Sequence, residues 1–144
     1  MQDENKTVYV FEVPGEPVAQ GRPRFSRRGG FITAYDPAKS RTYKEAVRLM
    51  VQQQMQGKKI IEDGCKATID IFRGIPASWS KKKRTEALAG KIRPVTKPDT
   101  DNYIKIILDS LNSIVYKDDN LILEITARKW YSDAPRVLVK IETL

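Results

Sequence analysis

The segment from Lys97 to Glu124 restricts the possible folds most, because it gathers carboxylates within a basic chain. It holds six acidic residues and three lysines. The 144-residue chain as a whole has 26 Lys and Arg against 18 Asp and Glu, a formal net charge of +8. Acidic residues that serve only solubility would not concentrate in this way. The segment therefore predicts a cation-binding site, and the basic remainder predicts a surface for a polyanion such as nucleic acid.

Apolar spacing within this segment predicts a helix over residues 99–112, a short loop and a strand over residues 121–131. Pro98 favours an extended backbone before the helix, and Asp99 or Thr100 is the candidate N-cap. The expected core face of the helix carries Tyr103, Ile104, Ile107, Leu108 and Leu111. The opposite face aligns three charged residues at helical spacing, namely Asp101, Lys105 and Asp109.

Each acid also has an ordinary structural interpretation. Asp99 could cap the helix, and Asp101 with Lys105 could form an i,i+4 ion pair that contributes roughly 0.3 kcal/mol. The acidic pair Asp118-Asp119 favours a site instead, because a helix–loop–strand unit is expected to return Asp119 toward Asp99 and Asp101. Carboxylates about 4 Å apart repel by roughly 4 kcal/mol at an effective dielectric near 20, so such a cluster needs a cation.

The composition limits the chemistry and the compartment. The chain has no histidine, which removes His bases, His-based triads and His-containing zinc sites. Oxygen ligands alone favour Mg²⁺, with Mn²⁺ as the second choice. The single cysteine, Cys65, is expected in the core and fits a reducing compartment. No apolar run suggests a membrane span or a signal peptide, so we expect a cytoplasmic protein.

The length suits one domain over residues 1–144, with residues 1–6 disordered. The remaining elements expected from apolar spacing and turn residues are a strand over Val8–Val13, a helix over Pro37–Gln56 with Ser40 as a candidate N-cap, a strand over Lys66–Phe72 and a short helix over Ser80–Gly90.

Two basic segments flank the acidic one. Residues 20–48 and 81–97 each carry a balance of +6, and Gly29-Gly30 predicts a turn between two extended segments of the first. Phe25 and Phe31 could stack on unstacked bases there. A solvated basic surface is the alternative interpretation of both segments. The candidate phosphate contacts are Arg22, Arg24, Arg27, Arg28, Lys81, Lys82, Lys83, Arg84 and Lys97.

An ordered series of residues resembles a known family. Lys97-Pro98-Asp99-Thr100-Asp101-Asn102, then Lys105, Asp109-Ser110-Leu111-Asn112 and Asp118-Asp119 resemble the K-P-D-x-D-N-x-x-K-x-x-x-D-x-L-N pattern and following D-D pair of the RusA family. These are Holliday junction resolvases, here of the phage and prophage type. Gly21-Arg22-Pro23-Arg24 is similar to the family's G-R-P-R segment. Ser113 departs from the glycine that many members have after L-N.

The resemblance implies a small α/β (α+β) domain with a mixed sheet packed by helices, and a Mg²⁺-dependent endodeoxyribonuclease. It implies a homodimer that cuts four-way DNA junctions in recombination and repair. It also implies that Asp99, Asp101 and Asp119 bind the metal, that Lys105 is catalytic and that Asp118 supports them. Two alternatives remain: a non-catalytic basic DNA-binding module, and a nuclease that prefers forks, flaps or single strands.

Overall fold

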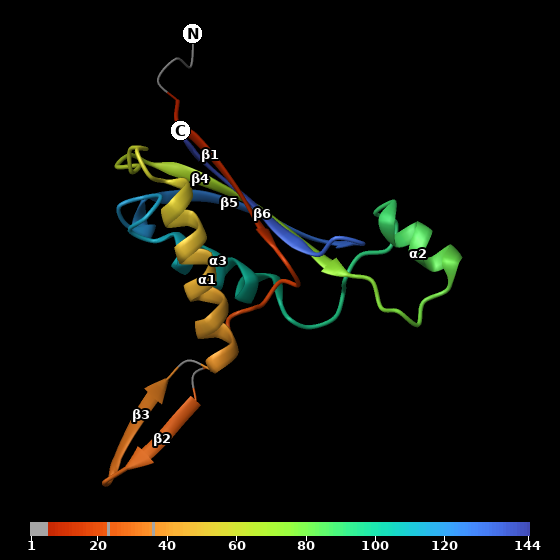
Figure 1. Cartoon of the computed structure of the whole chain (residues 1–144), viewed down its shortest axis with the longest axis horizontal. Helices are drawn as coiled ribbons and strands as arrows, with labels where there is room; N and C mark the ends of the chain where they lie inside the picture. Colours follow the sequence, from red (N-terminus) through yellow and green to blue (C-terminus); the bar gives the residue numbers. More distant parts are fainter. Residues whose placement is uncertain (1–5, 23, 36) are drawn as a thin grey trace.

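A mixed β-sheet forms the centre of the molecule (Figure 1). The computed structural model describes residues 6–22, 24–35 and 37–144. The sheet has the strand order β1-β6-β4-β5. Its strands are β1 (Val8–Pro14), β4 (Cys65–Gly74), β5 (Ile122–Ser132) and β6 (Arg136–Thr143). Strand β6 pairs antiparallel with both β1 and β4, whereas β4 and β5 are parallel.

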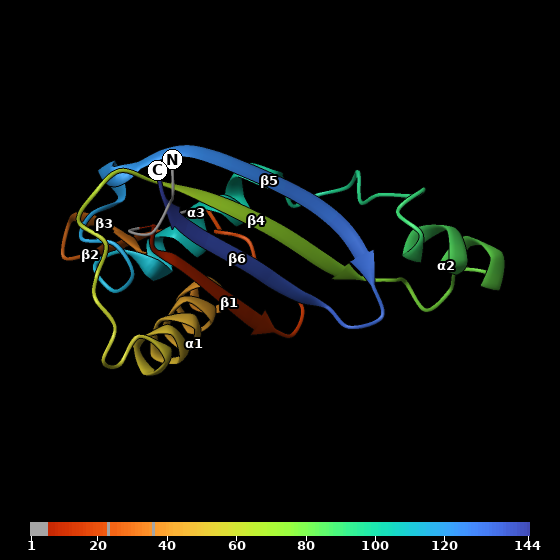
Figure 2. The ribbon, with the colours of Figure 1, turned by 90° about the horizontal axis from the view of Figure 1, so that it is seen from above.

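The described residues form three α-helices, and two of them pack together with the sheet. They are α1 (Ala38–Gln54), α2 (Lys81–Leu88) and α3 (Thr100–Leu111). Helices α1 and α3 lie on the same side of the sheet, whereas α2 lies beyond the end of β4 (Figures 1 and 2). A separate hairpin pairs β2 (Arg24–Arg28) with β3 (Phe31–Tyr35) around the turn at Gly29-Gly30. This architecture confirms the predicted α+β class.

Helices α2 and α3 connect the parallel strands β4 and β5. Neighbouring parallel strands need such a crossover connection, because a tight turn between them would make the second strand antiparallel. The start of α3 lies at the carboxyl-terminal part of this strand pair, since Lys129 of β5 donates to the carbonyl of Pro98. Binding sites in open α/β sheets favour that edge.

The core forms between the sheet and helices α1 and α3. Ala67, Ile69 and Ile71 alternate along β4 and are at most 1% exposed, as the predicted strand requires. The predicted apolar face of α3 is also buried, apart from the half-buried Ile104, and Ile106 joins it. Burial of apolar area contributes about 25 cal/mol per Å² to stability. The apolar face shared by α3 and the sheet is therefore the main contribution that holds α3 in place.

One local prediction needs correction, and one strand was missed. Ser40 does not cap α1, because the N-cap is Pro37 and Ser40 is buried within the first turn. Ser40 Oγ instead accepts the Gly21 N–H at 2.9 Å. Strand β6 was not predicted, although Val137, Val139 and Ile141 alternate along it and are buried. The strands over residues 8–13 and 66–72 and the helices over 37–56, 80–90 and 99–112 are confirmed within a few residues.

The expected core position of Cys65 is confirmed, and Ser113 adopts the conformation of the glycine that it replaces in the family pattern. Cys65 is a free thiol with no exposed surface. Ser113 follows the C-cap of α3 with φ 67°, the left-handed conformation that glycine adopts most easily. The expected disorder at the N-terminus falls on residues 1–5, which lie outside the described ranges, and on the exposed Lys6. Within those ranges, no helix combines the length and apolar character of a membrane span.

Candidate active site

Two carboxylates without hydrogen-bonding partners stand at the start of α3. Asp99 is the N-cap residue in extended conformation, but its side chain makes no capping hydrogen bond. Asp99 and Asp101 are both exposed, and within the described ranges neither forms a hydrogen bond or an ion pair. Lys105 pairs at 3.5 Å with Asp109, not with Asp101. The predicted N-cap position of Asp99 is confirmed, but its side chain caps nothing, and the predicted pair of Asp101 with Lys105 is not formed. Both carboxylates are therefore available for a ligand.

Two cations from the parallel strands hold the segment that leads into Asp99. The ammonium of Lys129 donates to the carbonyls of Thr96 and Pro98 at 3.1 and 3.0 Å. Arg73, near the end of β4, donates to the carbonyl and hydroxyl oxygens of Thr96 at 3.4 and 3.3 Å. The Lys97–Pro98 peptide bond between these contacts is cis. The backbone position of Asp99 therefore depends on side chains from both strands.

The electrostatics of Lys129 connect it to the same site. Burial lowers the pKa of Lys129, repulsion from Arg73 lowers it further, and the carboxylate of Asp99 acts in the opposite direction. The backbone carbonyl of Lys129 accepts the Arg93 Nε–H at 2.9 Å, and the Arg93 guanidinium lies 3.7 Å from the ring centroid of Trp130. Lys129 is thus a partly desolvated cation close to Asp99, on a strand that Arg93 contacts at two neighbouring residues.

The linker between β1 and β2 contacts the first turn of α3. Gln20 N–H donates to the carbonyl of Asn102 at 2.9 Å. At Gly21 an added Cβ would lie 2.8 Å from Cγ of Pro37 and 3.1 Å from Oγ of Ser40, so only glycine fits between the linker and α1. This contact brings Arg22, which the sequence separates from the acidic segment by about 75 residues, close to Asp99 and Asp101.

Asp118 and Asp119 lie at the opposite end of α3. Asp118 caps the 3₁₀ turn Asp119–Leu121, accepting the Asp119 N–H at 3.0 Å. Burial is the main cause of the raised pKa of Tyr116, and Asp119 and Asp109 raise it further. Tyr116 donates to the carbonyl of Leu108. Asp119 therefore lies beside the last turns of the helix and not beside its first turn.

The expected return of Asp119 to Asp99 and Asp101 does not occur within one chain. A strand that follows a helix begins beside the helix C-terminus, and only its far end returns to the helix start. From Ile122 to Lys129 the strand covers seven steps, roughly 23 Å at about 3.3 Å per residue. Across the described ranges, no three His, Cys, Asp or Glu side chains are grouped closely enough to hold one metal ion.

The predicted phosphate-binding residues differ in their surroundings. Arg84 is already paired, since it lies 3.1 Å from Asp133, and Lys83 lies 3.9 Å from the ring centroid of Trp79. The side chains of Arg24, Arg28 and Phe31 lie outside what the structure describes. The exposed candidates without an ion pair in the described ranges are Arg22, Arg27, Lys81, Lys82 and Lys97.

Sequence reasoning missed Arg73, Lys129 and Arg48. Arg48 of α1 donates to the carbonyls of Asp109, Ser110 and Asn112 at 3.2–3.3 Å, so it caps the C-terminus of α3. The only available signal for Arg73 and Lys129 was a basic residue within a strand that is otherwise largely apolar. Their partners lie 23 and 31–33 residues away along the chain, beyond the reach of local patterns.

The fold and the site define a small α+β domain with carboxylates without protein partners at a helix start, beside basic side chains of the adjoining strands. The chain matches the family model "Endodeoxyribonuclease RusA" over residues 14–142 and belongs to this family. It is also 45% identical over 133 residues to "Uncharacterized protein YqaN" of Bacillus subtilis (strain 168). This match covers 91% of this chain and 93% of that protein. The suspected family resemblance is confirmed.

Proposed function

We propose that the protein is a Mg²⁺-dependent endodeoxyribonuclease that cuts four-way DNA junctions as a homodimer, in recombination and repair. The observation that carries this proposal is the pair Asp99 and Asp101, two carboxylates without protein partners at the carboxyl-terminal edge of β4 and β5. Carboxylate oxygens that no protein group occupies are the ligands that a divalent cation such as Mg²⁺ takes. Membership of the RusA family supports the class of reaction.

Asp99 and Asp101 supply oxygen atoms, the ligand type that Mg²⁺ prefers, and they fit the ion as two of its ligands. Bound Mg²⁺ would polarise the scissile phosphate and lower the pKa of a coordinated water. Lys105 lies one turn further along α3 with 62% of its side chain exposed, and its ion pair with Asp109 is long enough to exchange for a phosphate. In this role Lys105 offsets the charge that develops on the phosphate in the transition state.

The position of Asp119 supports a homodimer. Asp119 is an exposed acid, and within one chain it is not grouped with Asp99 and Asp101. In a two-fold dimer the Asp119 of each copy can complete the site of the other. A four-way junction has two-fold symmetry and needs two nicks, which suits two equivalent sites. Asp118 then keeps a supporting role, since it holds the backbone of Asp119.

A mixed-dimer experiment tests the shared site. Asp101→Asn and Asp119→Asn proteins are each expected to be inactive. When they are unfolded together and refolded, half of the dimers should contain one intact site and nick junctions. A site built within one chain would leave every dimer inactive, so no recovered nicking would refute the shared arrangement while leaving the nuclease assignment intact.

The substrate is tested with four-way junctions, forks, flaps and duplexes of matched sequence in Mg²⁺ and in Mn²⁺. We expect junctions to be cut fastest and duplexes to resist. Preference for forks, flaps or single strands would replace the junction assignment with the related nuclease alternative. No cleavage of any of these DNAs would favour the non-catalytic DNA-binding module.

Asp101→Asn tests the residue assignment. It should lower cleavage at least about 100-fold, the scale of a lost electrostatic group at a reacting phosphate, while junction binding is retained. Asp63→Asn is the matched control, because Asp63 is exposed in the loop before β4 and has no ion pair in the described ranges. Cleavage by Asp101→Asn at the wild-type rate would show that α3 does not carry the active site.

A further inference from the structure

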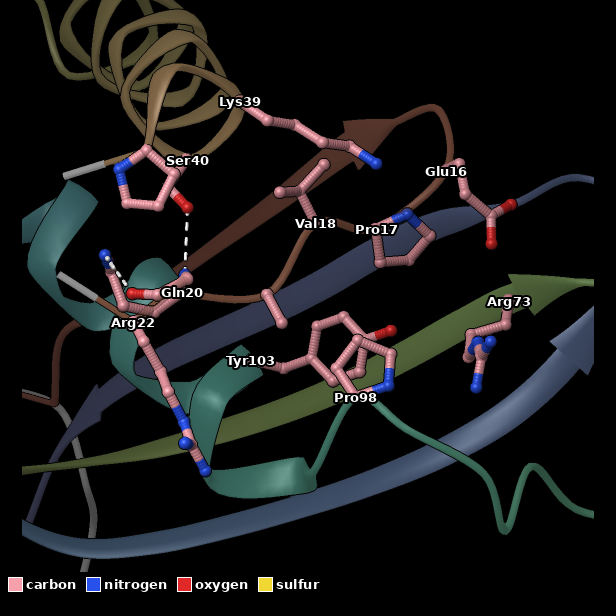
Figure 3. A pocket seen from close by; sticks show the side chains of 13 residues that line it. Glu16, Pro17, Val18, Gln20, Arg22, Lys39, Ser40, Arg73, Pro98 and Tyr103 are labelled. Atoms are coloured by element: carbon pink, nitrogen blue, oxygen red, sulfur yellow. Dashed lines mark hydrogen bonds between the residues drawn. The ribbon is translucent and has the colours of Figure 1, made fainter. Parts of the chain in front are cut away.

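A cavity of about 660 Å³ opens beside the candidate active site (Figure 3). It lies between the linker over residues 16–22, the start of α1, the end of β4 and the segment that enters α3. Pro98, which directly precedes Asp99, lines it. Its volume falls within the range of about 300–1,000 Å³ that is usual for ligand pockets. The cavity is therefore continuous with the position of the proposed chemistry.

The walls of this cavity are held in place by specific contacts. Gly21 donates to the buried Ser40 on one side, and an added Cβ at Gly21 would clash with Pro37. On the other side Glu16 accepts the Gly74 N–H at 3.1 and 3.3 Å. The cavity is thus a built feature of the fold, and no helix or strand of the described chain fills it.

The lining combines apolar surface with cations. Pro98, Val18 and Ala19 supply half-buried apolar surface, whereas Pro17 and Tyr103 are buried at its floor. Figure 3 shows the Tyr103 hydroxyl pointing into the space between Pro17, Pro98 and Arg73. A planar group with polar edges fits such a lining.

Three cations surround this space: Arg22, Lys39 and Arg73. Arg22 and Lys39 are exposed and have no ion pair in the described ranges, so both are free to bind phosphates. Among the described residues of the lining, Glu16 is the one carboxylate, and it accepts the Gly74 N–H. The excess of positive charge around apolar surface suits a nucleotide better than an acidic metal complex or an apolar peptide.

We propose that this cavity takes one unstacked nucleotide of the DNA strand that is cut, with its base against Pro98, Val18 and Ala19 and its phosphates on Arg22 and Lys39. This inference rests on the proposed nuclease function and specifies its substrate. Removing a base from a duplex stack costs a few kcal/mol, and the cost is least where bases are already unpaired. The cavity would therefore favour branch points over continuous duplex.

Base occupancy is measured with 2-aminopurine, whose fluorescence rises when it leaves the base stack. After the cut has been mapped with the wild-type protein, Asp101→Asn protein is titrated into junctions with one 2-aminopurine at each of three positions on either side of the cut. At least a twofold rise is expected at one position. A scan without any responding position would overturn the proposal, and would point to another occupant, such as a peptide.

Variants then localise the signal. In the Asp101→Asn background, Ala19→Phe places a ring in the cavity lining, and Lys39→Glu reverses a surface charge without touching the core. Each should remove the fluorescence rise and weaken junction binding about tenfold, on the scale of one lost base stack. Lys59→Glu, an exposed lysine beyond the far end of α1, is the matched control and should change neither.

The two proposals fail in different ways. If wild-type protein cuts junctions but Lys39→Glu keeps the full fluorescence rise, the cavity proposal alone is refuted. Thermal melting of Ala19→Phe shows whether that variant is folded, and Lys39→Glu decides the matter if it is not. If wild-type protein cuts none of the DNAs tested in Mg²⁺ or Mn²⁺, the nuclease function fails, and the inference that rests on it fails as well.

Discussion

Lys129→Met isolates the contact that sets the position of Asp99. The substitution keeps most of the side-chain stem and removes an ammonium that donates to two carbonyls at 3.0 and 3.1 Å. Hydrogen bonds from charged donors contribute about 1.5–3 kcal/mol, but the burial that lowers the pKa of Lys129 offsets part of this gain. We therefore expect the free energy of unfolding to fall by only about 1–2 kcal/mol.

The effect on cleavage should be larger than the effect on stability. Without Lys129, Arg73 is the one side chain of the described residues that still donates to the segment from Thr96 to Asp99. A displacement of about 1 Å at a catalytic group lowers rates on the order of 100-fold. Because Lys129 acts through Asp99 and not on the DNA, kcat should fall about 100-fold while KM stays within about threefold of the wild-type value.

The assay is steady-state cleavage of a fluorescently labelled junction, together with urea unfolding of each variant. Lys129→Arg, which keeps a charged donor, should recover cleavage to within about tenfold of wild type. Lys140→Met is the matched control, since Lys140 lies on β6 and pairs with Glu142 at 3.6 Å. A raised KM with unchanged kcat would show that Lys129 binds DNA, and the positioning argument would be refuted.

Three further predictions concern other parts of the chain. Arg48→Met should lower the free energy of unfolding by about 1–2 kcal/mol in urea melts, because three carbonyls at the end of α3 lose their donor; an unchanged midpoint would contradict this capping role. Ser113→Gly should raise stability by about 0.5 kcal/mol, because glycine relieves the strain at φ 67°, and a loss of stability would contradict it. Arg22→Ala should weaken junction binding and reduce the slope of log K against log salt by about 1, whereas an unchanged slope would show that Arg22 contacts no phosphate.

The sequence was sufficient for features that depend on neighbours along the chain. The helical spacing of Tyr103, Ile107 and Leu111 predicted α3 and its buried face, and the alternation of residues 67–71 predicted β4. The position of Asp99 and Asp101 at the start of a helix followed from Pro98 and from that same spacing. Such patterns succeed because the hydrogen bonds of a helix and the alternation of a strand involve only nearby residues.

Only the tertiary structure decided which distant segments meet. It inserted β6 between β1 and β4, brought Gln20 onto Asn102, and returned Lys129, not Asp119, to the start of α3. Strand pairing and crossover direction depend on contacts across tens of residues, and no local period encodes them. The sequence of this protein therefore determined which residues carry the charges, whereas the direction of β5 after α3 decided which of those charges share a site.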